Sequence, residues 1–116
     1  MTIDISFNQN KLLVNSHEAE FRYPIERVVE LDSLLIVLLE VPFNEYECRN
    51  IWGVDFEGNL QWQVQDPAGI PNIFDPLPFK SIEISRSGEV VAADFSGRRM
   101  KIDIAGGKIL GRDFTK

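Results

Sequence analysis

The chain has 116 residues, of which 44% are hydrophobic and 26% charged, which is typical of one globular domain with a buried core. Its net charge of −6 argues against nucleic acid or an anionic membrane as the main partner, so neither is expected. The opening residues lack the basic and apolar regions of a signal peptide, and the single cysteine, Cys48, fits a reducing compartment; we therefore expect a cytoplasmic protein.

Apolar and polar residues alternate along most of the chain, which predicts antiparallel strands with one buried face. The segment LQWQVQ, for example, places Leu60, Trp62 and Val64 on one face and three glutamines on the other. The predicted strands span residues 3–7, 11–15, 18–23, 26–31, 34–41, 50–56, 60–65, 80–85, 89–95, 98–104 and 108–113.

Residues 24–31 are open to two interpretations. Pro24, followed by Ile25, Val28 and Val29 at helical spacing, permits a short helix. The two adjacent β-branched valines favour a strand instead. The next run, LLIVLL (34–39), is apolar at every position and too short to span a bilayer, so we expect a central strand.

One pattern occurs twice in the chain, at a spacing of 48 residues: VDFEGNLQW (54–62) and IDIAGGKIL (102–110). In each copy an Asp, Asp55 or Asp103, lies between apolar residues and comes three positions before a Gly. We expect both aspartates to stabilise turns through their side chains. The spacing lies in the range of propeller blades, but a closed propeller needs about four blades.

We therefore predict an all-β fold, an antiparallel sandwich or rolled sheet of about ten strands that is not a closed propeller. The chain would form a single domain, 1–116, built from two propeller-blade-like units. These units cover about 26–65 and 80–114, with a proline-rich loop, 66–79, between them. Two units cannot close a ring, so they are expected to bury their faces on each other or on a second chain.

The segments NIWGVDFEGNLQWQV (50–64) and VVAADFSGRRMKIDIAGGKIL (90–110) resemble the hairpins of quinoprotein-type propeller repeats. In such repeats the aromatic residue after the Gly turn packs between blades. The second segment departs from the pattern, with Gly107 in place of Thr-Gly and Leu110 in place of Trp. The whole chain resembles small bacterial proteins that keep these hairpins as a free-standing domain, some of which look like immunity proteins beside secreted toxins.

Side chains suited to catalysis are sparse. The only histidine, His17, lies in a predicted turn, and nothing near Cys48 in the sequence would lower its pKa. No zinc or calcium spacing and no phosphate-binding glycine loop occurs. We expect no catalytic residue, no cofactor and no metal, and we favour a protein that is not an enzyme.

Two loops carry the candidate binding residues. The segment QDPAGIPNIFDPLPFK (65–80) holds four of the six prolines together with Ile73, Phe74 and Phe79. A loop of this length is often functional, and proline stiffening lowers the entropy cost of binding. It could equally fold back as a lid over the open end of the core.

The second loop, EVPFNEYECRN (40–50), places glutamates around two aromatic residues. Aromatic side chains provide contact area and carboxylates can pair with Arg or Lys, so this loop suits a basic partner. The alternative is a solvated hairpin tip. Together the two loops give the candidate partner-binding residues Glu40, Phe43, Glu45, Tyr46, Glu47, Ile73, Phe74 and Phe79.

The function expected from these features is that of a non-enzymatic cytoplasmic domain that binds a basic protein. The most specific version is an immunity-type inhibitor that covers its partner with acidic and aromatic loop residues. One alternative is a small-ligand-binding or enzymatic domain with a pocket under loop 66–79. Another is a structural subunit that pairs through a sheet edge, and a homodimer is one possible assembly.

Overall fold

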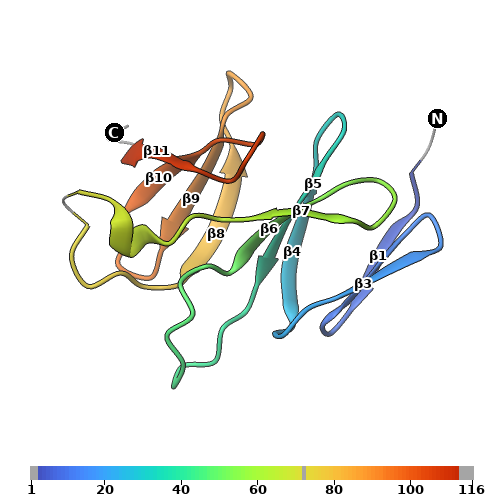
Figure 1. The fold of residues 1–116 in the computed structure, drawn as a ribbon, viewed down its shortest axis with the longest axis horizontal. Helices are drawn as coiled ribbons and strands as arrows, with labels where there is room; N and C mark the ends of the chain where they lie inside the picture. Colours follow the sequence, from blue (N-terminus) through green and yellow to red (C-terminus); the bar gives the residue numbers. More distant parts are fainter. Residues whose placement is uncertain (1–2, 72, 113–116) are drawn as a thin grey trace.

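The computed structural model describes residues 3–71 and 73–112 and contains eleven strands and one short 3-10 helix. The strands form three antiparallel sheets arranged as layers, and in the described residues no sheet closes into a barrel (Figure 1). The predicted all-β, sandwich-like fold is therefore confirmed. No helix in these residues has the length and apolar character needed to cross a membrane.

The N-terminal sheet has three strands in the order β1-β2-β3 (blue in Figure 1). Its strands are β1 (Ile5–Asn8), β2 (Lys11–Val14) and β3 (His17–Glu20). The turn between β2 and β3 uses Asn15 and Ser16, both with positive φ, which is the backbone of the tight hairpin turns that match strand twist.

The middle sheet is a four-stranded meander that runs β4-β5-β6-β7. Its strands are β4 (Ile25–Glu30), β5 (Leu35–Leu39), β6 (Ile51–Val54) and β7 (Leu60–Gln63). Residues 25–30 pair with β5 along their length, so the strand interpretation of this segment is correct and the helical alternative is wrong.

The C-terminal sheet repeats the meander as β8-β9-β10-β11. Its strands are β8 (Phe79–Ile84), β9 (Val90–Asp94), β10 (Arg99–Ile102) and β11 (Ile109–Arg112). The two meanders occupy the segments 25–63 and 79–112; residues 113–114 of the second predicted unit, about 80–114, lie outside the described part of the chain.

The middle sheet lies between the other two, and strand β5 is buried at every position, as expected for a central strand. Ile36 and Leu38 of β5 pack in one core with residues of the C-terminal sheet. Leu35, Val37 and Leu39 pack in a second core with residues of the N-terminal sheet. The sequence predicted the first contact, between the two units, but not the N-terminal sheet as a third layer.

One predicted strand face is wrong. Trp62 and Val64 are buried toward the C-terminal sheet, but Leu60 is half exposed and lies in a hollow beside Tyr23 and Trp52. The cause is a β-bulge: Trp62 pairs with Gly53, whereas Leu60 pairs with the adjacent Val54. The extra residue reverses the alternation expected from the sequence.

Aspartates hold three of the hairpin turns, as expected for Asp55 and Asp103. Asp55 Oδ1 accepts the backbone N–H groups of Glu57 and Asn59, each at 2.9 Å. Asp103 Oδ1 accepts the N–H of Ala105 at 3.1 Å. Asp94 caps a third turn in the same way. It also comes three positions before a Gly, but the repeat identified in the sequence did not include it.

Candidate functional site: an acidic groove between two loops

The two loops singled out in the sequence lie on adjoining sides of the molecule, loop 40–50 at the bottom of Figure 1 and loop 66–79 along its left side. Loop 40–50 follows β5, and loop 66–79 leads into β8. Four aromatic side chains project from these loops and the β9–β10 turn: Phe43, Tyr46, Phe74 and Phe95, exposed by 104, 81, 75 and 60%. They are the aromatic side chains of the described residues that are more than half exposed.

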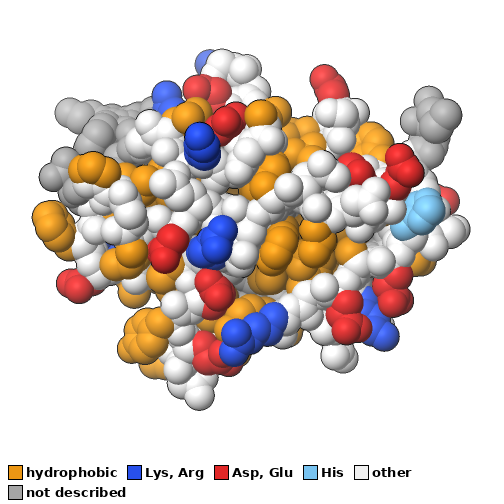
Figure 2. All heavy atoms as spheres, viewed as in Figure 1, with side chains coloured by type: hydrophobic (Ala, Val, Ile, Leu, Met, Phe, Trp, Pro, Cys, Tyr) orange, Lys and Arg blue, Asp and Glu red, His pale blue; other side chains and the backbone are white. Residues whose placement is uncertain are grey.

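A groove of about 740 Å³ joins the two loops. We call it the acidic groove; it is lined by Pro24, Glu26, Glu40, Val41, Pro42, Phe43, Glu45, Tyr46, Leu77, Pro78, Phe79 and Phe95. In Figure 2, hydrophobic side chains lie along the lower-left edge of the molecule with acidic side chains among them. The structure thus brings five of the eight candidate residues into one groove, and adds others from β4 and the β9–β10 turn.

Three glutamates line the acidic groove, and its described lining contains no Lys or Arg. Glu26 and Glu40 are exposed, and their carboxylates make no hydrogen bond or ion pair with another described residue. Glu45 accepts a hydrogen bond of 2.8 Å from the Tyr23 hydroxyl and lies 3.5 Å from Nη2 of Arg22. The wall of the groove is therefore negatively charged without an internal counter-ion at two of its three carboxylates.

Sequence reasoning missed Glu26, which looked like an ordinary polar position of a strand. The register of β4 against β5 shifts between Ile25 and Arg27, which pair with Leu39 and Leu38. Glu26 is the extra residue of this bulge, and bulges redirect side chains. The surplus residue appears only when the two strands are paired, so the linear sequence carries no signal for it.

Glu47 does not line the acidic groove, although it belongs to the same loop. Its Oε1 accepts the backbone N–H of Arg49 at 2.8 Å. It borders a separate hollow of about 290 Å³, whose lining includes Arg22 and Arg49. Glu47 therefore accepts a backbone hydrogen bond and borders a hollow that contains two arginines, in contrast to Glu40.

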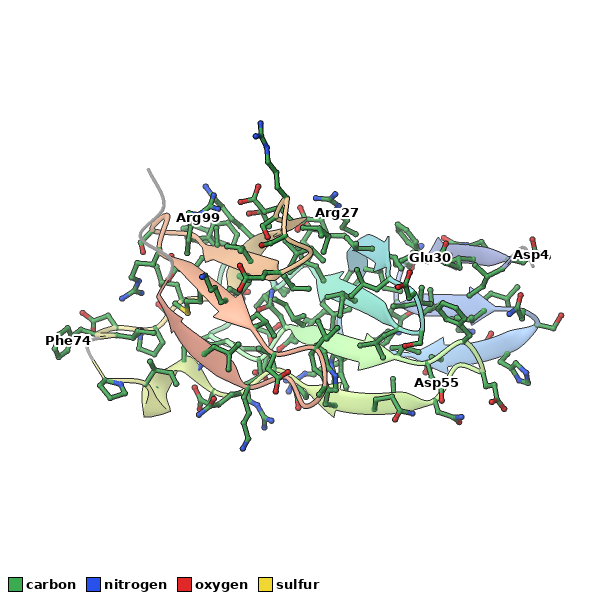
Figure 3. The ribbon with its side chains drawn as sticks, turned by 90° about the horizontal axis from the view of Figure 1, so that it is seen from above. Asp4, Arg27, Glu30, Asp55, Phe74 and Arg99 are labelled. Carbon is green, nitrogen blue, oxygen red and sulfur yellow. The ribbon has the colours of Figure 1, made fainter. Side chains whose placement is uncertain are left out.

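Loop 66–79 combines a lid with an exposed tip. Ile73 and Phe79 are 6% and 1% exposed and pack in the core between the middle and C-terminal sheets. Phe74 projects away from the fold, as Figure 3 shows at its left edge. Folding back as a lid therefore describes Ile73 and Phe79, whereas a recognition surface can use Phe74.

Arg98 fixes the exposed tip of this loop. Its guanidinium donates to the backbone carbonyls of Phe74 and Asp75, and its Nε lies 2.8 Å from Oδ2 of Asp94. Asp94 is fully buried, and its Oδ1 also accepts the hydroxyl and the backbone N–H of Ser96. The tip is thus tied to the β9–β10 turn, which also presents Phe95.

Cys48 and His17 are the other chemically versatile side chains outside the acidic groove. Burial and the nearby carboxylates of Asp66 and Glu47 raise the pKa of the Cys48 thiol, which disfavours the reactive thiolate. His17 is exposed on β3. The described residues contain no group of three or more His, Cys, Asp or Glu side chains that could hold a metal ion.

A second hollow, of about 860 Å³, lies at the opposite end, among the hairpin turns. Its lining includes Glu30, Asp32 and Glu57 together with the aliphatic residues Leu34 and Ile104. Figure 3, seen from that end, labels Glu30 and the turn residue Asp55. This hollow offers fewer exposed aromatic side chains than the acidic groove.

The chain belongs to the family described as Domain of unknown function (DUF7957), because the model of that family matches residues 2–114. No curated protein and no solved structure matches the chain.

Proposed function

We propose that the protein is a non-enzymatic protein-binding domain, and that its partner contacts the acidic groove and the aromatic side chains around it. The observation that carries this proposal is that Phe43, Tyr46 and Phe95, each more than half exposed, line one groove. The exposed Phe74 lies on loop 66–79, which Arg98 ties to the turn that presents Phe95. Exposed aromatic side chains are unfavourable in water, and clusters of them are typical of protein interfaces.

The loops that present these side chains are held in place before any partner arrives. Tyr23 donates to Glu45 in the first loop, and Arg98 donates to the carbonyls of Phe74 and Asp75 in the second. A surface that is already ordered loses less conformational entropy on binding. These contacts therefore support binding rather than a solvated hairpin tip.

The charge of the chain favours a basic partner. Residues 1–66 contain 12 acidic and 4 basic side chains, a net charge of −8, and residues 67–116 contain 6 acidic and 8 basic, a net charge of +2. An excess of one sign near a binding surface speeds association with a partner of the opposite sign. A more specific proposal, an immunity-type inhibitor of a basic toxin domain in the cytoplasm, rests on the resemblance of the hairpins and on the single cysteine.

Affinity capture from the native host, followed by variants, tests the proposal. We expect a captured protein to be lost with the double variant Phe43→Ser/Tyr46→Ser and retained with Leu110→Ser. Leu110 is a fair control because it is 65% exposed but lies on β11, outside the acidic groove. All these sites are exposed, so the melting temperature should change little. Equal capture by wild type and the double variant would contradict the proposal.

A further inference from the structure

The acidic groove combines apolar walls with carboxylates that have no ion pair among the described residues. On the C-terminal sheet, Glu83 lies 2.6 Å from Arg99 and Glu89 lies 3.7 Å from Lys101. In the acidic groove, Glu26 and Glu40 have no such neighbour among the described residues. The opposite hollow also has carboxylates without an ion pair to another described residue, at Glu30, Asp32 and Glu57, but of the two it is the acidic groove that places them beside exposed aromatic rings.

The remaining walls of the groove are apolar. Pro42 and Phe43 come from the first loop, Leu77 and Pro78 from the second, and Phe95 from the β9–β10 turn. Walls of this kind exclude water from a bound group and so strengthen its interaction with a nearby charge. Aromatic rings also attract cations through their faces.

These two properties select the chemistry of an occupant. A neutral apolar side chain would cover the carboxylates without pairing them, which is unfavourable. An anionic group would be repelled. A Lys or Arg side chain fits both parts, because its aliphatic stem can lie on the apolar walls while its charged head reaches the glutamates.

We infer that the acidic groove receives a Lys or Arg side chain from a segment of the partner protein, flanked in that segment by apolar residues. Glu26 and Glu40 pair with the charged head, and the rings of Phe43 and Phe95 contact the apolar neighbours. This inference rests on the proposed function and names the feature of the partner that the groove recognises.

Nuclear magnetic resonance titration of the isotope-labelled protein with short peptides tests the inference without a known partner. The first probe is the capped peptide Ala-Leu-Arg-Leu-Ala. The second has the same sequence with citrulline in place of Arg, which keeps the shape and removes the charge. We expect the first peptide to shift the amide signals of residues 26, 40, 43 and 95, with a dissociation constant of about 1 mM. We expect the citrulline peptide to bind about fivefold more weakly.

Two single variants provide a matched pair. Glu40→Gln and Glu47→Gln each remove one negative charge from the same loop, but only Glu40 lines the acidic groove. Glu40→Gln should weaken the Arg peptide about threefold and leave the citrulline peptide unchanged, whereas Glu47→Gln should change neither. Equal weakening by both variants would mean that overall charge, rather than the groove, governs binding, and would overturn the inference.

The remaining outcomes separate this inference from the proposed function. If both peptides bind the groove with equal affinity, the groove is a protein-binding site without a preference for a cation, and only the inference fails. If the Arg peptide shifts signals of the opposite hollow, around Glu30 and Leu34, the inference fails in the same way. If neither peptide binds, the inference fails; if the Phe43→Ser/Tyr46→Ser variant also still captures every partner, the proposed function fails with it.

Discussion

The indole ring of Trp62 lies against the Cα of Gly107, which belongs to the turn between β10 and β11 of the neighbouring sheet. Its Nε1 donates a hydrogen bond of 2.8 Å to the backbone carbonyl of Ile104 in the same turn. On its own sheet the ring covers Gly53, so it is enclosed by two glycines. The aromatic residue after the first Gly turn therefore joins the two meanders.

Gly107 is required at this contact for two reasons. Its φ of +76° is unfavourable for other residues, and a Cβ would overlap Cε3 of Trp62. We expect Gly107→Ala to lower the free energy of unfolding by at least about 2 kcal/mol, measured by urea denaturation. The adjacent Gly106 has open space at its Cβ position and no positive φ, so Gly106→Ala should change stability by less than about 0.5 kcal/mol. Similar effects of the two variants would contradict this account.

A buried amide makes a second connection between the same two sheets. Asn50 is 1% exposed; its Oδ1 accepts the N–H of Phe79, and its Nδ2 donates to the carbonyls of Phe79 and Leu39. Asn50→Ala would leave three buried backbone groups unpaired, and we expect a loss of about 2–4 kcal/mol in the free energy of unfolding. Asn44→Ala, at an exposed position of loop 40–50, should have no measurable effect.

The ion pair beneath the tip of loop 66–79 gives a third prediction. Arg98→Met would leave the buried Asp94 carboxylate without its cation, and we expect a loss of about 3 kcal/mol in stability. Hydrogen exchange at residues 73–75 should also become faster, because Arg98 no longer holds the carbonyls of Phe74 and Asp75. The double variant Arg98→Met/Asp94→Asn should recover part of the lost stability, since it removes the unpaired charge. A double variant no more stable than Arg98→Met would show that the charge is not the cause.

Strand positions were predictable from the sequence because alternation and glycine turns are local signals. All eleven predicted strands occur, each within a few residues of its expected bounds. The layering was only partly predictable. The N-terminal strands contribute few buried side chains, such as Leu12 and Val14, and nothing in their pattern identifies the sheet they cover. Which faces meet is decided by contacts between distant segments, and a single sequence does not contain them.

The candidate site, like the fold, was predictable from the sequence only in its local parts. Loops 40–50 and 66–79 were identifiable by their prolines and aromatic residues, but their meeting at one groove follows from the meander topology. Phe56 and Phe95 show that the same local sequence can place a side chain differently. Both follow an Asp in an Asp-Phe-x-Gly turn. Phe56 packs against the core of the N-terminal sheet, whereas Phe95 is 60% exposed in the groove. The burial of these two side chains therefore depends on which segments pack beside each turn, and the turn sequence itself does not encode this.

Tyr23 gives a prediction at alkaline pH. Burial and the hydrogen bond to Glu45 raise the pKa of its hydroxyl. A raised pKa means that the stabilisation is complete below the unfolded value of about 10 and is lost as the pH rises through the folded value. We expect Tyr23→Phe to cost about 1 kcal/mol at pH 7, and the difference from wild type to shrink at higher pH. Tyr46→Phe, at an exposed position, is the control and should leave stability unchanged; a constant Tyr23→Phe effect across this range would contradict the assignment.

Asp55 gives the opposite dependence, at acidic pH. Burial acts to raise the pKa of its carboxyl, but hydrogen bonds from Asn59 and Glu57 outweigh that effect, and the pKa is lowered. A lowered pKa means that the stabilisation is complete above the unfolded value of about 4 and is lost as the pH falls through the folded value. Asp55→Asn should therefore destabilise the protein at pH 7, with the difference in melting temperature from wild type narrowing below pH of about 4. Asp32→Asn changes the net charge equally at a position without a hydrogen bond to another described residue, and its effect should not vary in this way. If the two variants respond alike to acid, then overall charge, rather than the turn held by Asp55, sets the acid stability.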